Sequence, residues 1–85
     1  MKYISVMCWE PDKAEKVTEL FLKWKIPEGF KILAGPFSVL GGNKSITVFE
    51  SDAESLALVD RYWRNTCHSE IMPVLDSAEI AKMKA

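Results

Sequence analysis

Histidine and cysteine, the side chains most often used for metal binding and redox chemistry, are scarce in this sequence. Its 85 residues include one histidine, His68, and two cysteines, Cys8 and Cys67. The cysteines form no CxxC pair, and these residues are too few for a structural zinc site, so we expect no metal and no cofactor. The two sulfurs come close if the first and last strands are antiparallel neighbours. Because disulfides are uncommon in the cytosol, we expect two free thiols.

The sequence also has no excess of one charge and no long apolar run. Eleven basic and twelve acidic residues leave a formal charge of −1, and the sequence pI is about 5.8. This balance gives no general attraction to nucleic acid or to an anionic membrane. No apolar run approaches the roughly 18 residues of a membrane span. The N-terminus has no basic stretch before an apolar one and no small-residue cleavage site, so the expected compartment is the cytoplasm.

The strand-forming segments are rich in β-branched and aromatic residues. They span residues 2–9, 30–40, 44–50 and 65–75. The second contains Gly35-Pro36, and because proline cannot donate a ladder hydrogen bond, this strand is expected at an edge or bent. Gly41-Gly42-Asn43 predicts a hairpin between the second and third strands. Residues 1–85 are the size of one domain, short enough for its own core to give marginal stability.

Two amphipathic helices are predicted between these strands. The first begins at Glu10-Pro11-Asp12, where proline suits the first turn and acidic residues suit the helix dipole. Its inner stripe consists of Ala14, Val17, Leu20, Phe21 and Trp24. Ser51 to Glu54 matches a capping box for the second helix, which extends to about Arg64. Its inner stripe is Leu56, Val59 and Trp63, and a short tail helix is expected at residues 77–84.

This order predicts an α+β ferredoxin-like βαββαβ sandwich, in which two helices cover one face of an antiparallel four-stranded sheet. Both faces of the central strands are apolar. The residues assigned to the helix side are Ile4, Val6, Ile46 and Val48. Those assigned to the opposite side are Tyr3, Met7, Trp9 and Phe49. Since a contiguous apolar patch is rarely left in water, we expect these last four to be the dimer face of a homodimer.

Three short motifs resemble a family of small uncharacterised bacterial and archaeal proteins. They are Trp9 with Pro11, Trp24 followed by Pro27-Glu28-Gly29, and Met72-Pro73-Val74-Leu75-Asp76. That family is similar to the dimeric α+β barrel superfamily, which includes cofactor-independent monooxygenases, haem-degrading enzymes, muconolactone isomerase-like proteins and ligand-sensing domains. The resemblance covers most of the chain. It implies a dimeric α+β barrel more strongly than it implies an activity.

His68 is the candidate catalytic residue, because histidine is the side-chain type that most often exchanges protons near neutral pH. It is expected near the start of the fourth strand, close to the sheet end that carries Trp9, and Glu70 shares its strand face. Trp9, His68 and Glu70 therefore form the candidate ligand pocket. The alternative is a partly exposed histidine at a strand end with no catalytic role.

Two kinds of function remain open. The first is a homodimer that binds a small apolar or aromatic ligand, or that has a structural role. The second is a cofactor-independent monooxygenase- or isomerase-like enzyme, with His68 as general base and Trp9 lining the site. Gly41-Gly42-Asn43 lacks the phosphate-loop pattern and joins two strands, and the aromatic and basic pattern of RNA-recognition domains is missing. Nucleotide and nucleic-acid binding are therefore disfavoured.

Overall fold

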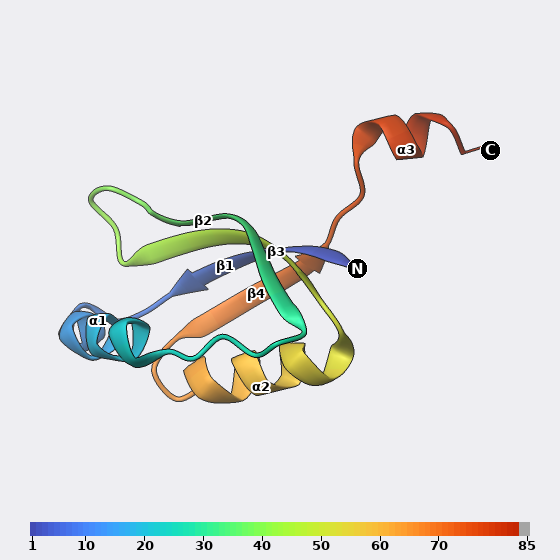
Figure 1. The fold of residues 1–85 in the computed structure, drawn as a ribbon. Helices are drawn as coiled ribbons and strands as arrows, with labels where there is room; N and C mark the ends of the chain where they lie inside the picture. Colours follow the sequence, from blue (N-terminus) through green and yellow to red (C-terminus); the bar gives the residue numbers. More distant parts are fainter. Residues whose placement is uncertain (84–85) are drawn as a thin grey trace.

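The predicted order of strands and helices is confirmed in the computed structural model, which describes residues 1–83 (Figure 1). The elements are β1 (Lys2–Cys8), the 3-10 turn η1 (Pro11–Lys13), α1 (Ala14–Lys23), β2 (Phe30–Ser38), β3 (Lys44–Ser51), α2 (Ala53–Trp63), β4 (His68–Pro73) and α3 (Ser77–Ala81). The strands form one antiparallel sheet in the order β2-β3-β1-β4. Figure 1 shows α1 and α2 on the same face of this sheet, as in a ferredoxin-like fold. Within residues 1–83, no helix has the length and apolar character needed to cross a membrane.

β2 is an edge strand, as Gly35-Pro36 predicted. Its pairing with β3 shifts register twice, between Ile32 and Ala34 and between Ala34 and Phe37. Gly35 has a φ of 88°, in the left-handed region that favours glycine. A Cβ at Gly35 would also lie 2.7 Å from the Ile46 carbonyl oxygen. The Gly35-Pro36 segment therefore bends the strand while keeping it in the sheet.

α2 begins one residue later than the predicted capping box. Asp52, not Ser51, is the N-cap, and its Oδ1 accepts a hydrogen bond of 2.7 Å from the Ser55 amide. The Ser51 hydroxyl instead donates to the Asp52 carbonyl oxygen over 2.8 Å. Gly29 lies against this cap, where an added Cβ would overlap Asp52 Oδ2 and Ser55 Oγ. The glycine of the Pro27-Glu28-Gly29 motif thus has a packing role at the start of α2.

We expect Asp52→Ala to lower the melting temperature by roughly 5 °C at pH 7, because the Ser55 amide loses its acceptor. Hydrogen bonds from the amide and the hydroxyl of Ser55 hold the pKa of Asp52 below its ordinary value. A carboxyl with a lowered folded-state pKa stabilises the fold above its unfolded-state pKa, and this contribution is lost as the pH falls through the folded-state value.

Thermal unfolding followed by circular dichroism should therefore show the full difference between wild type and Asp52→Ala at pH 7. The difference should shrink below about pH 4, near the ordinary pKa of an aspartate. Asp52→Asn is the matched control, because asparagine is also a good N-cap but does not titrate. A difference between wild type and Asp52→Ala that stays constant down to pH 2 would contradict this role for the carboxylate.

The predicted facing of the central strands was wrong. Phe49 is 2% exposed and belongs to the core between the sheet and the helices. Its ring lies 4.4 Å from that of Phe30 and 5.5 Å from that of Tyr3, its partner on β1. Because side chains alternate along a strand, Met7 shares this face with Tyr3, and Trp9 packs against the same core. All four residues predicted to form the dimer face therefore face the helices.

The opposite face of the sheet, here called the outer sheet face, is also apolar. It consists of Ile4, Val6, Cys8, Ala34, Phe37, Ile46, Val48 and Met72. Phe37 is 60% exposed and Met72 is 44% exposed, while the remainder are half-buried. Figure 1 shows α3 beyond the end of β4, apart from the sheet and the other helices. Its Ile80 is 53% exposed. Lys84, predicted to lie in the tail helix, is outside the described residues.

The two cysteines are free thiols, as predicted. Cys67 is buried in the core and Cys8 is half-buried on the outer sheet face. Burial, and to a smaller extent the neighbouring Cys8, raise the pKa of the Cys67 thiol. Cys67 therefore acts as a small apolar core residue.

Candidate functional site

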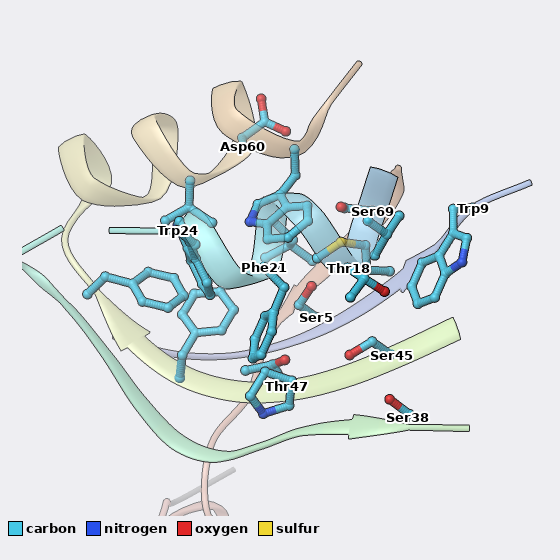
Figure 2. Close-up of a pocket in the computed structure, with 18 residues that line it drawn as sticks. Ser5, Trp9, Thr18, Phe21, Trp24, Ser38, Ser45, Thr47, Asp60 and Ser69 are labelled. Atoms are coloured by element: carbon cyan, nitrogen blue, oxygen red, sulfur yellow. The ribbon is translucent and has the colours of Figure 1, made fainter. Parts of the chain in front are cut away.

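A cavity of about 270 Å³ lies between the sheet and the two helices (Figure 2). α1 contributes Val17, Thr18 and Phe21, α2 contributes residues that include Asp60 and Trp63, and the strands form the floor. Two kinds of side chain line it. The large apolar ones include Met7, Trp9, Phe21, Trp24, Phe49 and Trp63. The hydroxyl-bearing ones are Ser5, Thr18, Ser38, Ser45, Thr47 and Ser69.

An aromatic cluster forms one part of the cavity wall. The Trp24 ring lies edge-on to Phe30 at 5.8 Å and edge-on to Trp63 at 5.5 Å, and it stacks on Tyr62 at 6.4 Å. Tyr62 Oη donates a 2.6 Å hydrogen bond to the Leu20 carbonyl, which ties α2 to α1. Trp24 and Trp63 were predicted as core residues from their helix stripes, and both pack in or against the core. The cluster fixes the position of α1 relative to α2.

The Trp63 indole has no conventional partner in this cluster. Its Nε1 is buried, and no group of residues 1–83 accepts a hydrogen bond from it. The ring meets Trp24 and Tyr62 edge-to-face, at interplanar angles of 80° and 78°. Such contacts place the positive edge of one ring against the negative face of another. The Trp63 ring is therefore held in the cluster by aromatic contacts and not by a hydrogen bond from its indole.

Hydroxyl groups occupy the cavity floor. This hydroxyl floor, as we call it, consists of Ser5, Ser38, Ser45, Thr47 and Ser69. Ser5 is the cross-strand partner of Thr47, Ser45 is that of Ser38, and Met7 pairs with both Ser45 and Ser69. Because paired strands lie about 4.8 Å apart, the hydroxyls make two neighbouring rows across the sheet. Figure 2 shows Ser5, Ser38, Ser45 and Thr47 below Phe21 and Thr18 of α1, and Ser69 on the other side of Thr18.

The sequence pattern did not predict the hydroxyl floor. Ser45 and Thr47 alternate with apolar residues and share a side of the third strand with Phe49, which was predicted to face away from the helices. In the structure this side faces α1 and α2, and the side-chain hydrogen bonds within residues 1–83 involve no member of the floor. A strand that changes from hydroxyl to aromatic residues on one face, as β3 does from Ser45 to Phe49, was the available signal.

The cavity is almost free of charge. Among the described residues that line it, Asp60 is the one charged side chain, and no lysine, arginine or histidine is present. The Asp60 carboxylate forms an ion pair with Arg64, one turn further along the chain. The lining therefore offers aromatic surface, neutral hydroxyl groups and one paired carboxylate.

The structure does not bring the three predicted pocket residues into one cavity. Trp9 lines the cavity and is seen at one end of it in Figure 2. His68 and Glu70 are the cross-strand partners of Cys8 and Val6, so both lie on the opposite face of the sheet, where they are exposed. His68 meets Trp9 only in a separate, shallower groove at the sheet end, which Lys13 and Arg64 also line. Residues 1–83 hold no group of three or more His, Cys, Asp or Glu side chains placed to bind a metal.

Comparison with known proteins places this chain in a family. No curated protein matches it. Among solved structures, a DUF3240 family protein from Shewanella baltica OS155 is similar, with 18% sequence identity and a TM-score of 0.39, over 89% of this chain and 92% of that chain. The family model of a domain of unknown function, DUF3303, matches residues 1–85. The chain therefore belongs to the DUF3303 family, whose function is unknown.

Proposed function

We propose that this protein binds a small, largely apolar or aromatic molecule in the cavity between α1 and the sheet. The observation that carries the proposal is the cavity itself, of about 270 Å³. Small-molecule sites usually have volumes of roughly 300 Å³ or more and combine mostly apolar walls with a few polar groups. This cavity is close to that size, and its aromatic wall and hydroxyl floor supply both kinds of surface.

The packing of α1 supports access to this cavity. None of the ten residues of α1 is buried, although the helix closes one side of the cavity. Phe21 lines the cavity and is nevertheless 49% exposed. A bound apolar molecule would cover part of this ring, so binding would be favoured by the burial of apolar surface. We propose no reaction at His68, because it lies on the other face of the sheet.

We also propose that two copies associate through the outer sheet face, giving a dimeric α+β barrel with the helices outside. This face differs from the dimer face expected from the sequence. An apolar patch that includes Phe37 at 60% exposure is rarely left in water on a monomer. Lys44 and Glu70 bring opposite charges to the same face, which suits a two-fold interface that must complement itself. In this arrangement each copy keeps its own cavity.

A cavity-filling substitution tests the ligand proposal. N-phenyl-1-naphthylamine is a neutral aromatic probe whose fluorescence rises in an apolar site. We expect saturable binding to the wild type and an affinity weaker by roughly tenfold or more in Ser45→Phe, because the new ring occupies the cavity floor. Fluorescence titration measures both affinities, and circular dichroism verifies that each variant is folded.

Ser77→Phe on α3 is the matched control, since it makes the same change outside the cavity lining. It should leave the affinity for the probe unchanged. Thr18→Phe on α1 fills the cavity from the other side and should repeat the loss if Ser45→Phe fails to fold. Equal probe affinity in the wild type and a folded cavity-filling variant would contradict the proposal.

A further inference from the structure

We infer that the ligand of this cavity is a neutral, flat molecule with oxygen on one edge, a phenol or ketone with one or two rings. The inference deepens the proposed function and rests on it. It comes from the way polarity is divided around the cavity. The hydroxyls without a protein partner lie on the strands. The aromatic side chains lie on α1 and the segments that flank it, on α2 as Trp63, and on β2 and β3 as Phe30 and Phe49.

The hydroxyl floor carries unused hydrogen-bonding capacity. Ser5 is only 8% exposed, and none of the five floor hydroxyls takes part in the side-chain hydrogen bonds of residues 1–83. The buried side-chain nitrogen and oxygen atoms without a partner in residues 1–83 are Trp9 Nε1 and Trp63 Nε1, so the floor hydroxyls are not sealed from water. Valine or isoleucine is nevertheless more usual than serine at such strand positions. Each hydroxyl can both donate and accept. Ligand oxygens along one edge would satisfy neighbouring hydroxyls of the two rows.

Thr18 gives an internal comparison. It is the hydroxyl residue that α1 contributes to the cavity lining. Its Oγ1 donates a 3.2 Å hydrogen bond to the Ala14 carbonyl within the helix. α1 therefore has its hydroxyl already engaged, and what this helix presents to a ligand is apolar. A ligand with polar groups all around its rim would leave some of them unpaired here.

The charge of the cavity lining argues against an anionic ligand. No cationic side chain of the described residues lines the cavity, and the one charged group, Asp60, is negative. A carboxylate buried here would lose its hydration without gaining a positive partner. A neutral hydroxyl or carbonyl group meets no such penalty, because the floor hydroxyls replace its water.

The aromatic side chains determine the preferred shape. Figure 2 shows Trp9, Phe21 and Trp24 arranged along the cavity, with the hydroxyl floor between and below them. Aromatic rings bind other flat rings by offset stacking or edge-to-face contacts. A flat ligand can therefore place its ring against these side chains while its oxygen-bearing edge meets the floor.

Three compounds that share the naphthalene ring system test the inference. They are naphthalene, 2-naphthol and 2-naphthoate, and each is titrated as a competitor of N-phenyl-1-naphthylamine. We expect 2-naphthol to displace the probe about tenfold better than naphthalene does, which is the effect of one or two hydrogen bonds. 2-Naphthoate should be the weakest competitor, since it is negatively charged at pH 7.

Removing the floor hydroxyls should abolish the preference for 2-naphthol over naphthalene. In a Ser5→Ala, Ser45→Ala, Thr47→Val triple variant, 2-naphthol should lose its advantage while naphthalene still competes as in the wild type. Ser77→Ala on α3 is the matched control, because it removes a hydroxyl outside the cavity lining. If the triple variant does not fold, Thr47→Val alone should reduce the preference by about threefold, as expected for part of the floor.

The outcomes separate this inference from the proposed function. Equal competition by naphthalene and 2-naphthol in the wild type, or strongest competition by 2-naphthoate, would overturn the inference and leave ligand binding intact. An unchanged preference in the folded triple variant would do the same. Failure of every compound to bind, the probe included, would overturn both.

Discussion

Phe49→Ala is expected to lower the free energy of unfolding by about 3–5 kcal/mol. The Phe49 side chain is 2% exposed and is the largest fully buried one among the described residues. It lies between the rings of Tyr3 and Phe30, so its removal leaves a void that these neighbours cannot close. Small domains have a total stability of about 5–15 kcal/mol. Urea unfolding followed by circular dichroism should therefore show a protein that is barely folded in the absence of urea.

Phe37→Ala provides the matched control for this loss. It makes the same change on the outer sheet face, where the ring is 60% exposed. Any loss of stability in Phe37→Ala should depend on protein concentration, because the substitution weakens the proposed association of two copies. The loss in Phe49→Ala should persist at every concentration. A larger, concentration-independent loss in Phe37→Ala than in Phe49→Ala would overturn the assignment of the sheet faces.

Val6→Glu is expected to convert the dimer into a folded monomer. Val6 pairs with Ile46 and with Glu70 on the outer sheet face, so a glutamate there would be buried against the partner sheet beside another carboxylate. We expect the dissociation constant to rise by about a hundredfold or more. Light scattering after gel filtration should give about twice the 9.6 kDa chain mass for the wild type, and the single-chain mass for Val6→Glu.

The neighbouring residue supplies the control for this experiment. Met7→Glu places the same charge on the helix side of β1, against the core, and should unfold the chain instead. Ser77→Glu on α3 should change neither the mass nor the fold. A wild type that is monomeric at micromolar concentration would rule out the outer sheet face as a homodimer interface. The same conclusion would follow if Val6→Glu remained dimeric.

The elements of the fold were predictable because their signals are local. Proline and glycine interrupt the chain where strands bend or helices end, and this predicted β2 as an edge strand. Apolar residues recur every three or four positions along each helix, ending at Trp24 in the first and including Val59 and Trp63 in the second. This spacing predicted which side of each helix faces the core. These patterns depend on the 3.6-residue period of a helix and on backbone chemistry. Neither requires knowledge of the tertiary structure.

The first residue of α2 could not be predicted from local signals alone. Ser51 and Asp52 are both good N-cap residues, and local sequence does not choose between them. The structure continues β3 through Ser51, which pairs with Phe30 and is buried. Asp52 then becomes the cap, and Gly29 leaves room for its carboxylate. The choice depends on contacts between segments more than twenty residues apart in the chain.

By itself, the sequence determined the βαββαβ order, the edge position of β2 and the inner stripes of the helices. It also determined that the sheet has apolar residues on both faces, which is the basis of the proposed dimer. The tertiary structure decided which face meets the helices. A strand has a period of two, so alternation yields two sets of residues and cannot tell which set is inside. Packing of Phe49 with Tyr3 and Phe30 makes that choice, and it places the hydroxyl floor inside the cavity and His68 outside.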